Sequence, residues 1–363
     1  MYYLATSART RRSPFTDRVE AAGVKGFTVY NHMLLPALFE DLAADCAHLK
    51  RAVQVWDVSV ERQVELVGPD AAKLLQMTTP RDLARMADDQ CYYVPLVGAD
   101  GYMINDPVAV RLAEDRFWIS IADTDALLYF KGLATGFGLN VSIFEPDVSP
   151  LAIQGPHADD LAAAVWGDAV RDLRFFRHMP VNVGGKQMIL ARSGWSKQGG
   201  FELYLDGSEY ANGIWDQLFE AGAQWDVRSG GPNLIERIES GLMSFGNDIQ
   251  MSDTPLHAGL GKFVHDVPGC LANDALKAMG PADRQIRAVE IAGDAVPSCM
   301  NAWAMSKDGA PVGEVRSAAF SPEFGTVVAV GMVDAVAWDA GTAVQVETPE
   351  GVRDATVRAG FWR

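Results

Sequence analysis

The chain has 363 residues, of which 48% are hydrophobic and 21% charged, a balance typical of globular proteins. A net charge of −16 without a basic run excludes a nucleic-acid-binding surface, because nucleic acid is itself an anion. No apolar run approaches the roughly 18 residues that span a bilayer, and the N-terminal segment lacks the apolar stretch of a secretory signal. The four cysteines are widely separated, which indicates neither a disulfide framework nor a metal cluster. We therefore expect a cytoplasmic protein that does not bind a membrane.

Helices are predicted at several places in the first two thirds of the chain. Ser13 is a candidate N-cap for a short helix that Gly23 ends. Apolar periodicity predicts a second helix over residues 35–49. Further helices are predicted over residues 208–222 and 233–243.

A strand–turn–helix unit occurs twice. The segment VELVGPDAAKLLQ, from Val64, resembles LAIQGPHADDLAA, from Leu151. Both read as a strand, a Gly-Pro turn and a helix with leucine on its inner face. Two such units indicate duplicated α+β halves packed around a shared interface. The alternative is the chance recurrence of a common turn.

The last part of the chain has a different pattern, in which short alternating strands follow one another with glycine turns. Such strands predict a small β-barrel. The expected strands cover residues 288–291, 312–315, 327–333, 343–348 and 355–359. We therefore expect a core over residues 1–280, built from two interleaved α+β subdomains, and a barrel domain over residues 281–363.

Four common types of enzyme site are missing from the sequence. There is no GxGxxG after a strand, no GxxxxGK[ST] phosphate loop, no GxSxG nucleophile elbow and no HExxH. The six histidines form no i,i+4 pair. The sequence therefore predicts no metal site, and no chemistry through a nucleotide phosphate or a covalent serine.

Two segments carry aromatic and carboxylate side chains. In CYYVPLVGADGYMINDPVAVRL, Asp106 stands at the start of an apolar strand, either as a turn residue or as a functional acid beside a cavity. In ARSGWSKQGGFELYL, a glycine-rich loop with Trp195 leads into a strand on which Glu202 and Tyr204 share a face. Such a group can bind a flat heterocycle, because a carboxylate accepts paired N–H donors and rings stack. The alternative is a hairpin with ordinary core aromatics.

A third segment contains a candidate cation. Arg237 lies in NLIERIESGLMSFGNDIQMSDTPLHAGLGKF and cannot face Glu239 across an i,i+2 spacing on a helix. It is therefore available to a partner elsewhere, such as the carboxylate of a substrate. The alternative is a surface salt bridge.

Taken together and in order, these segments resemble the aminomethyltransferase (glycine-cleavage T-protein) family. That family has a strand–Gly-Pro-Asp-Ala–helix unit, like VELVGPDAAKLL, and a DVS segment, as in VWDVSVERQ. Its R-[ST]-G-[YW]-x-x-x-x-G-[FV]-E segment is matched from Arg192 to Glu202, and its barrel motif is similar to residues 309–322. Within the family, TVYNHMLLP, TPRDL and SGWSKQGGFELY are most similar to the dimethylsulfoniopropionate demethylases.

The resemblance implies an α+β fold of three subdomains around a channel that holds tetrahydrofolate. It implies that Glu202 binds the N–H edge of the pterin, that Tyr93 lines the folate site and that Asp106 lies near the reacting nitrogen as the catalytic group. A sulfonium donor would favour aromatic faces, because its charge disappears in the transfer. We therefore expect Trp195 and Tyr204 near the donor.

Two departures from the family pattern leave the methyl donor open. Asn105 replaces the first acid of an Asp-Asp pair, and His257 stands where the family usually has glutamate. The alternatives are a paralogous demethylase of another methylated amine, sulfonium or aryl ether, or a glycine-cleavage aminomethyltransferase. A folate-binding iron–sulfur assembly factor would carry a K-G-C-Y-x-G-Q-E segment, which the sequence lacks. The expected partners are the methyl donor and tetrahydrofolate, and a homodimer is left open.

Overall fold

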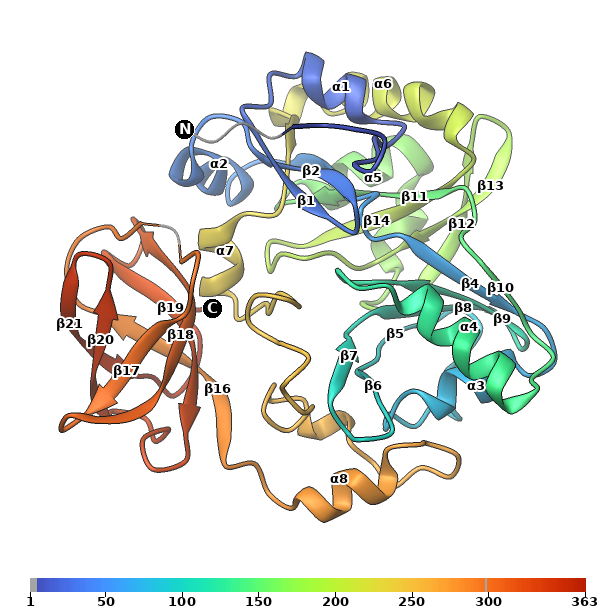
Figure 1. Ribbon diagram of the computed structural model, residues 1–363. Helices are drawn as coiled ribbons and strands as arrows, with labels where there is room; N and C mark the ends of the chain where they lie inside the picture. Colours follow the sequence, from blue (N-terminus) through green and yellow to red (C-terminus); the bar gives the residue numbers. More distant parts are fainter. Residues whose placement is uncertain (1–4, 298) are drawn as a thin grey trace. The chain divides into compact units, whose positions relative to one another are not determined.

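The computed structural model describes residues 5–297 and 299–363 (Figure 1). The contacts within the chain divide it into two compact units. Each unit is assembled from separate stretches of the chain. Unit 1 comprises Met1–Leu74, Ala84–Tyr93 and Pro107–Asn233, and unit 2 comprises Leu75–Leu83, Val94–Asp106 and Leu234–Arg363. This division is not contiguous in sequence, and the domain boundary expected at residue 281 stays a prediction.

Unit 1 contains a six-stranded sheet in the order β12-β13-β14-β11-β3-β15. Its neighbouring strands are antiparallel except for β15, which runs parallel to β3. The strands are β12 (His178–Val183), β13 (Lys186–Ala191), β14 (Gly200–Asp206), β11 (Val148–Gln154), β3 (Gln54–Asp57) and β15 (Arg228–Gly230).

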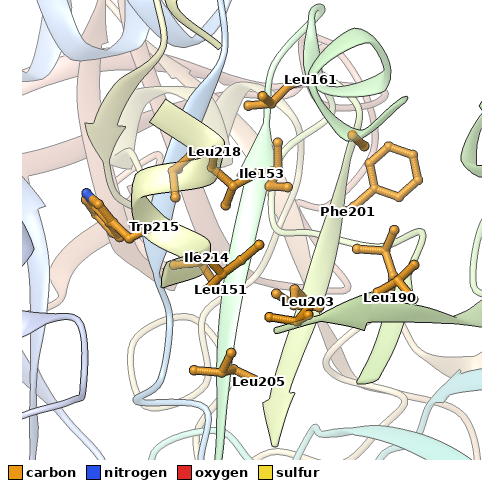
Figure 2. Packing of buried hydrophobic residues seen from close by; sticks show 14 of the residues in the cluster. Leu151, Ile153, Leu161, Leu190, Phe201, Leu203, Leu205, Ile214, Trp215 and Leu218 are labelled. Carbon is orange, nitrogen blue, oxygen red and sulfur yellow. The ribbon is translucent and has the colours of Figure 1, made fainter. Parts of the chain in front are cut away.

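One face of this sheet packs against helices. Alternate strand residues such as Leu151, Ile153 and Leu203 point toward Leu161 of α5 (Ala158–Trp166) and Leu218 of α6 (Ala211–Ala221), as Figure 2 shows. These side chains are fully buried. Burial of a leucine or isoleucine side chain contributes about 1.5–3 kcal/mol, so this layer fixes the sheet in place. The other residues of each strand, Glu202 among them, consequently point to the opposite face.

A second sheet of unit 1 has the order β10-β4-β9-β8-β5. Trp118 of this sheet and Tyr204 of β14 stack with ring centroids 6.0 Å apart, within an apolar cluster that draws on both sheets. The elements are β10 (Ser142–Phe144), β4 (Gln63–Val67), β9 (Arg116–Ser120), β8 (Val108–Ala113) and β5 (Cys91–Tyr93), with α4 (Ala126–Phe137) between β9 and β10.

The predicted repeat is present as two strand–turn–helix units. In the first, β4 leads through Gly68-Pro69 to α3 (Ala71–Met77), and in the second, β11 leads through Gly155-Pro156 to α5. Both glycines have positive φ, at 137° and 125°. A Cβ at Gly155 would stand 2.3 Å from the carbonyl oxygen of Ala52, so the turn requires glycine. The strand–turn–helix assignment is thereby confirmed for both copies.

The helix predicted over residues 35–49 is wrong in its first half. Residues up to 38 belong to the hairpin of β1 (Gly26–Tyr30) and β2 (Met33–Leu38), and only α2 (Leu42–Leu49) is helical. The carboxylate of Asp41 accepts a hydrogen bond from the backbone N–H of Ala44 at 2.8 Å and caps this helix. The apolar run of β2 is periodic by chance, because pairing with β1 determines its conformation.

The helix near residue 16 is present as α1 (Thr16–Ala21), but the N-cap predicted at Ser13 is wrong, because the N-cap position is Phe15. Helix α7 (Leu234–Glu239) is shorter than predicted. Gly241, with φ of 67°, follows the end of α7. Short 3-10 helices occur at η1 (Asp168–Asp172), η2 (Ser208–Tyr210), η3 (Ala223–Trp225) and η4 (Gly261–Phe263).

Unit 2 contains the expected barrel, closed in the order β16-β19-β18-β17-β20-β21. Five of its strands correspond to the five predicted ones, and the sixth, β17, was missed because WAMSK alternates only weakly. The elements of unit 2 are β6 (Leu96–Val97), β7 (Met103–Asn105), α8 (Asn273–Met279), β16 (Arg284–Ile291), β17 (Trp303–Lys307), β18 (Ala310–Ser321), β19 (Thr326–Asp334), β20 (Ala343–Thr348) and β21 (Gly351–Val357). In the part of the chain that the structure describes, no helix has the length and apolarity to cross a membrane.

Candidate active site

Glu202, a candidate site residue, lies in unit 1. It belongs to β14, on the face of the six-stranded sheet away from the helices, and pairs across the ladder with Ala152 of β11. Only 6% of the residue is exposed. Its Oε2 accepts a hydrogen bond of 2.5 Å from the hydroxyl of Ser193. A carboxylate has room for several donors, so the ionised group retains acceptor capacity for a ligand.

Burial sets the electrostatics of this group. Desolvation raises the pKa of Glu202, and the hydrogen bond from Ser193 opposes that shift. Cys91 of β5 is also buried, and both desolvation and the charge on Glu202 raise the pKa of its thiol. A buried carboxylate of this kind can bind paired N–H donors, such as those of a heterocycle, because their hydrogen bonds offset its desolvation.

Tyr204 lies deeper in unit 1 than its predicted role requires. It is 1% exposed, and its ring stacks on Trp118 at an interplanar angle of 27°. Burial raises the pKa of its hydroxyl well above the ordinary value, and the hydroxyl is hydrogen-bonded to Ser120. Tyr204 does share a strand face with Glu202, as predicted, but these contacts make it part of the core between the two sheets.

Trp195 lies on the loop between β13 and β14. It is half-buried, in contrast to the fully buried Tyr204. The loop begins at Arg192 and passes through Ser193, so the residue that binds Glu202 and the tryptophan are two positions apart. The structure therefore brings Glu202 and the Trp195 loop together in unit 1.

Tyr93 and Asp106 lie at either end of the β6–β7 hairpin. Tyr93 is the last residue of β5 and pairs with Val108 of β8. Asp106 is half-buried and follows the fully buried Asn105, two positions before Val108. The β5–β8 ladder thus brings position 93 opposite the residues that follow Asp106. Tyr93 belongs to unit 1 and Asp106 to unit 2.

Arg237 is engaged within unit 2. Its guanidinium donates to Asp248 at 2.6 Å and to the hydroxyl of Ser317 at 2.8 Å, and the residue is 5% exposed. The expectation that Arg237 is available to a substrate carboxylate is not supported, because the guanidinium is already in a buried ion pair with Asp248. The alternative of a surface salt bridge is also wrong, since Asp248 is fully buried. These contacts support a structural role.

His257, the departure from the family pattern, is fixed by two polar contacts in unit 2. The backbone N–H of Thr254 donates to Nδ1 at 3.2 Å, and Nε2 lies 3.2 Å from the carboxylate of Asp283. Desolvation and the charge of Arg284 lower the pKa of His257, which favours the neutral ring. In that form Nε2–H donates to Asp283, a bond that a glutamate could not make.

Two phenylalanines close to Tyr204 in unit 1 were not predicted from the sequence. Phe175 is 69% exposed and stacks on Phe176, with ring centroids 4.4 Å apart. Phe176 has φ of 56°, which is uncommon for a bulky residue. Its backbone N–H donates to Arg192, and its side chain packs against the cluster that contains Tyr204. Only the adjacent aromatics in LRFFR could have drawn attention to them.

Two surface depressions lie elsewhere. One of about 580 Å³ is on the barrel and includes Glu290 and Asp354, and one of about 350 Å³ includes His48 and Arg228. No predicted site residue lines either of them. Among residues 5–297 and 299–363, no group of three or more His, Cys, Asp or Glu is arranged to hold a metal ion.

Comparison with family models gives two matches that together span most of the chain. The GCVT N-terminal domain matches residues 15–266, and the glycine cleavage T-protein C-terminal barrel domain matches residues 284–360.

Individual relatives match over nearly the full length. The chain is 57% identical over 360 residues to the dimethylsulfoniopropionate demethylase DmdA of Ruegeria pomeroyi, covering 98% of each chain. It is 29% identical over 361 residues to a probable aminomethyltransferase of Halobacterium salinarum, covering 96% of this chain and 97% of that one. The glycine cleavage system aminomethyltransferase T of Bartonella henselae superposes with a TM-score of 0.85 at 24% identity, covering 97% of this chain and 98% of that one. The aminomethyltransferase-like fold is thereby confirmed.

Proposed function

The chain belongs to the glycine-cleavage T-protein family of folate-dependent transferases, and from that premise we propose that it demethylates dimethylsulfoniopropionate with tetrahydrofolate as the methyl acceptor. The products are 3-methylthiopropionate and 5-methyl-tetrahydrofolate. The observation that carries the proposal is 57% identity across 98% of both chains to a protein named for that activity.

The candidate site supports a folate role for Glu202. The pterin offers adjacent N–H donors on one edge, and a carboxylate that accepts both gains two charge-assisted hydrogen bonds. Glu202 is a buried acceptor whose Oε2 is oriented by Ser193 at 2.5 Å. Orientation by a fixed donor reduces the freedom that binding must remove. Tyr93 is proposed to line the same site.

The transfer moves a methyl group between two heteroatoms. The S–CH₃ bond breaks with its electron pair left on sulfur, an N–CH₃ bond forms, and the nitrogen releases its proton. Because the leaving group is a neutral thioether, most of the acceleration can come from holding nitrogen, carbon and sulfur in line. Asp106 is proposed to orient the acceptor and take up that proton.

Trp195 is proposed as the aromatic contact of the sulfonium. Trp195 is half-buried and lies on the same loop as Ser193, which donates to Glu202. Tyr204 supports the site from the core, through its stacking on Trp118. A carboxylate in direct contact with the sulfonium would stabilise the charged ground state and slow the reaction, whereas a ring face attracts the cation more weakly.

The alternative within the family is a demethylase of another methylated donor. A donor panel separates the two, with dimethylsulfoniopropionate, glycine betaine and an aryl methyl ether each incubated with the protein and tetrahydrofolate. The proposal predicts 5-methyl-tetrahydrofolate from the sulfonium alone. Formation of 5-methyl-tetrahydrofolate from glycine betaine or the aryl ether, and not from the sulfonium, would contradict the proposal and favour the alternative.

Binding measurements with a charged and a neutral ligand test Trp195. Trp195→Leu keeps apolar bulk but removes the quadrupole, which is worth about 0.5–2 kcal/mol toward a cation. Affinity for dimethylsulfoniopropionate should fall several-fold, and affinity for the neutral thioether 3-methylthiopropionate should change less. Equal losses for the two ligands would show that Trp195 contributes only apolar packing.

Two parts of the proposal rest on the sequence alone. They are a cytoplasmic location and a second copy of the chain as a partner. The first rests on cysteine usage, and the second is tested by the mass of the protein in solution.

A further inference from the structure

The loop between β13 and β14 carries both Ser193 and Trp195, but its own sequence does not fix its shape. Gly194 and Gly199 have positive φ, of 141° and 86°. Glycine adopts such angles without strain, and it also adopts many others in the unfolded chain. Contacts from outside the loop must therefore select one conformation.

Gln154, the last residue of β11, supplies such contacts. Its side chain is fully buried. Nε2 donates to the carbonyl of Ser193 at 3.3 Å and to that of Ile153 at 3.2 Å, while Oε1 accepts from the hydroxyl of Ser196 at 2.7 Å. The amide therefore holds the loop on both sides of Trp195.

The glycines around the amide leave room for it. A Cβ at Gly194 would stand 1.9 Å from Nε2 of Gln154, and one at Gly200 would stand 2.3 Å from the same atom. The backbone N–H of Gly155 also donates to the carbonyl of Gly199 at 3.0 Å. Glycine at positions 194 and 200 therefore leaves the space that the Gln154 side chain occupies.

We propose that Gln154 is a positioning residue for methyl transfer. It acts through the loop, setting the hydroxyl of Ser193 on Glu202 and the ring of Trp195 toward the donor. This inference deepens the proposed function and rests on it. The equivalent residue of the other strand–turn–helix unit, Val67, has no side-chain amide, so this device belongs to one of the two copies.

The test replaces the amide without emptying its space. Gln154→Met removes both kinds of hydrogen bond at similar volume, and Val67→Ala is the control at the equivalent position. The full chain is labelled with 5-fluorotryptophan, and Trp195→Phe identifies the ¹⁹F resonance of Trp195. In Gln154→Met that resonance should shift or broaden, and the Kd for tetrahydrofolate should rise about tenfold, as expected for lost orientation of a charge-assisted bond. Val67→Ala should change neither.

A purely structural role would lower the unfolding temperature of Gln154→Met and leave both the Trp195 resonance and the folate Kd at their wild-type values. That result would overturn the proposal. If Gln154→Met does not fold, Ser196→Ala, which removes one of the loop contacts, is measured in the same way and should shift the Trp195 resonance. The ¹⁹F spectrum does not depend on turnover. A wild-type protein that transfers no methyl from the sulfonium would therefore refute the proposed function, while the spectrum still decides whether Gln154 orders the loop.

Discussion

Glu202 is an acid that the fold holds in an apolar layer, and this placement has a cost that can be measured. Burial raises its pKa, so the folded protein favours the protonated form more than the unfolded chain does. Stability from this group is therefore fully present below the unfolded pKa and is lost as the pH rises through the raised folded value. A site that sacrifices stability for a buried charge is typical of a binding function.

The first prediction uses Glu202→Gln to separate the effect of Glu202 on stability from its effect on folate binding. The amide carries no charge, so the free energy of unfolding of the variant should exceed that of the wild type at neutral pH, and the difference should vanish below about pH 4, where both side chains are neutral. Affinity for tetrahydrofolate should fall about ten- to a hundredfold, because an amide offers one acceptor where two are needed. Urea titrations across pH and calorimetry measure both.

Glu220→Gln, at an exposed position on α6, is the matched control and should show neither effect. A Glu202→Gln protein that is less stable than the wild type at neutral pH, or that binds folate normally, would contradict this description of the site.

The second prediction concerns Asp106. If it takes up the proton of the acceptor nitrogen, Asp106→Asn should lower kcat by about 10²–10⁴-fold and change KM little. Asp100→Asn, at an exposed position of the same hairpin, should behave as the wild type. Near-normal turnover by Asp106→Asn would show that Asp106 is a turn residue only.

The sequence identified candidate site residues more readily than the residues that contact them. The pattern around Glu202 could be read because residues on one strand face follow from alternation. The partners of Arg237 could not, because Asp248 lies in an irregular segment and Ser317 on a distant strand. In the sequence Gln154 is only the residue before a Gly-Pro turn. Its contacts with residues 193–196 depend on the folded loop and could not be predicted.

The strand–Gly-Pro–helix unit occurs twice in the fold, and the turn glycine of its second copy has no room for a side chain. Gly155 has φ of 125°, and a Cβ there would meet the carbonyl oxygens of Ala52 and Leu49 at 2.3 and 3.1 Å. Gly132, in the interior of α4, has nothing within 4 Å of the same position. The turn therefore requires glycine at position 155, whereas α4 has room for a side chain at position 132.

The third prediction uses this contrast. Gly155→Ala should lower the free energy of unfolding by at least about 1–3 kcal/mol, since it adds a clash to an unfavourable backbone conformation. Gly132→Ala should raise it by about 0.5–1 kcal/mol through helix propensity and reduced freedom of the unfolded chain. Urea denaturation followed by circular dichroism measures both. Changes of the same sign would show that the turn geometry is wrong.

At the scale of the molecule, sequence patterns predicted what is local and missed what is not. The closed barrel could be predicted because its strands are contiguous and alternate, and α3 and α5 because each follows a punctuated turn. Which stretches of the chain make up each unit could not be predicted. Residues 75–83 and 94–106 fold with unit 2 while their neighbours in sequence fold with unit 1, and only long-range packing decides that. The hairpin of β1 and β2 is local, and it was missed for a different reason, because a short apolar run such as that of β2 fits a helix as well as a strand.

The central claim is that this chain moves a methyl group from a sulfonium to tetrahydrofolate, and labelling the methyl carbon tests it most directly. Dimethylsulfoniopropionate with ¹³C in its S-methyl groups is mixed with excess wild-type protein and tetrahydrofolate, and the ¹³C spectrum is recorded over a single turnover. We predict that the label appears on the folate nitrogen in step with 3-methylthiopropionate, and that it does so far more slowly with Glu202→Gln at subsaturating folate. Label that stays on sulfur in the presence of correctly folded protein would contradict the account.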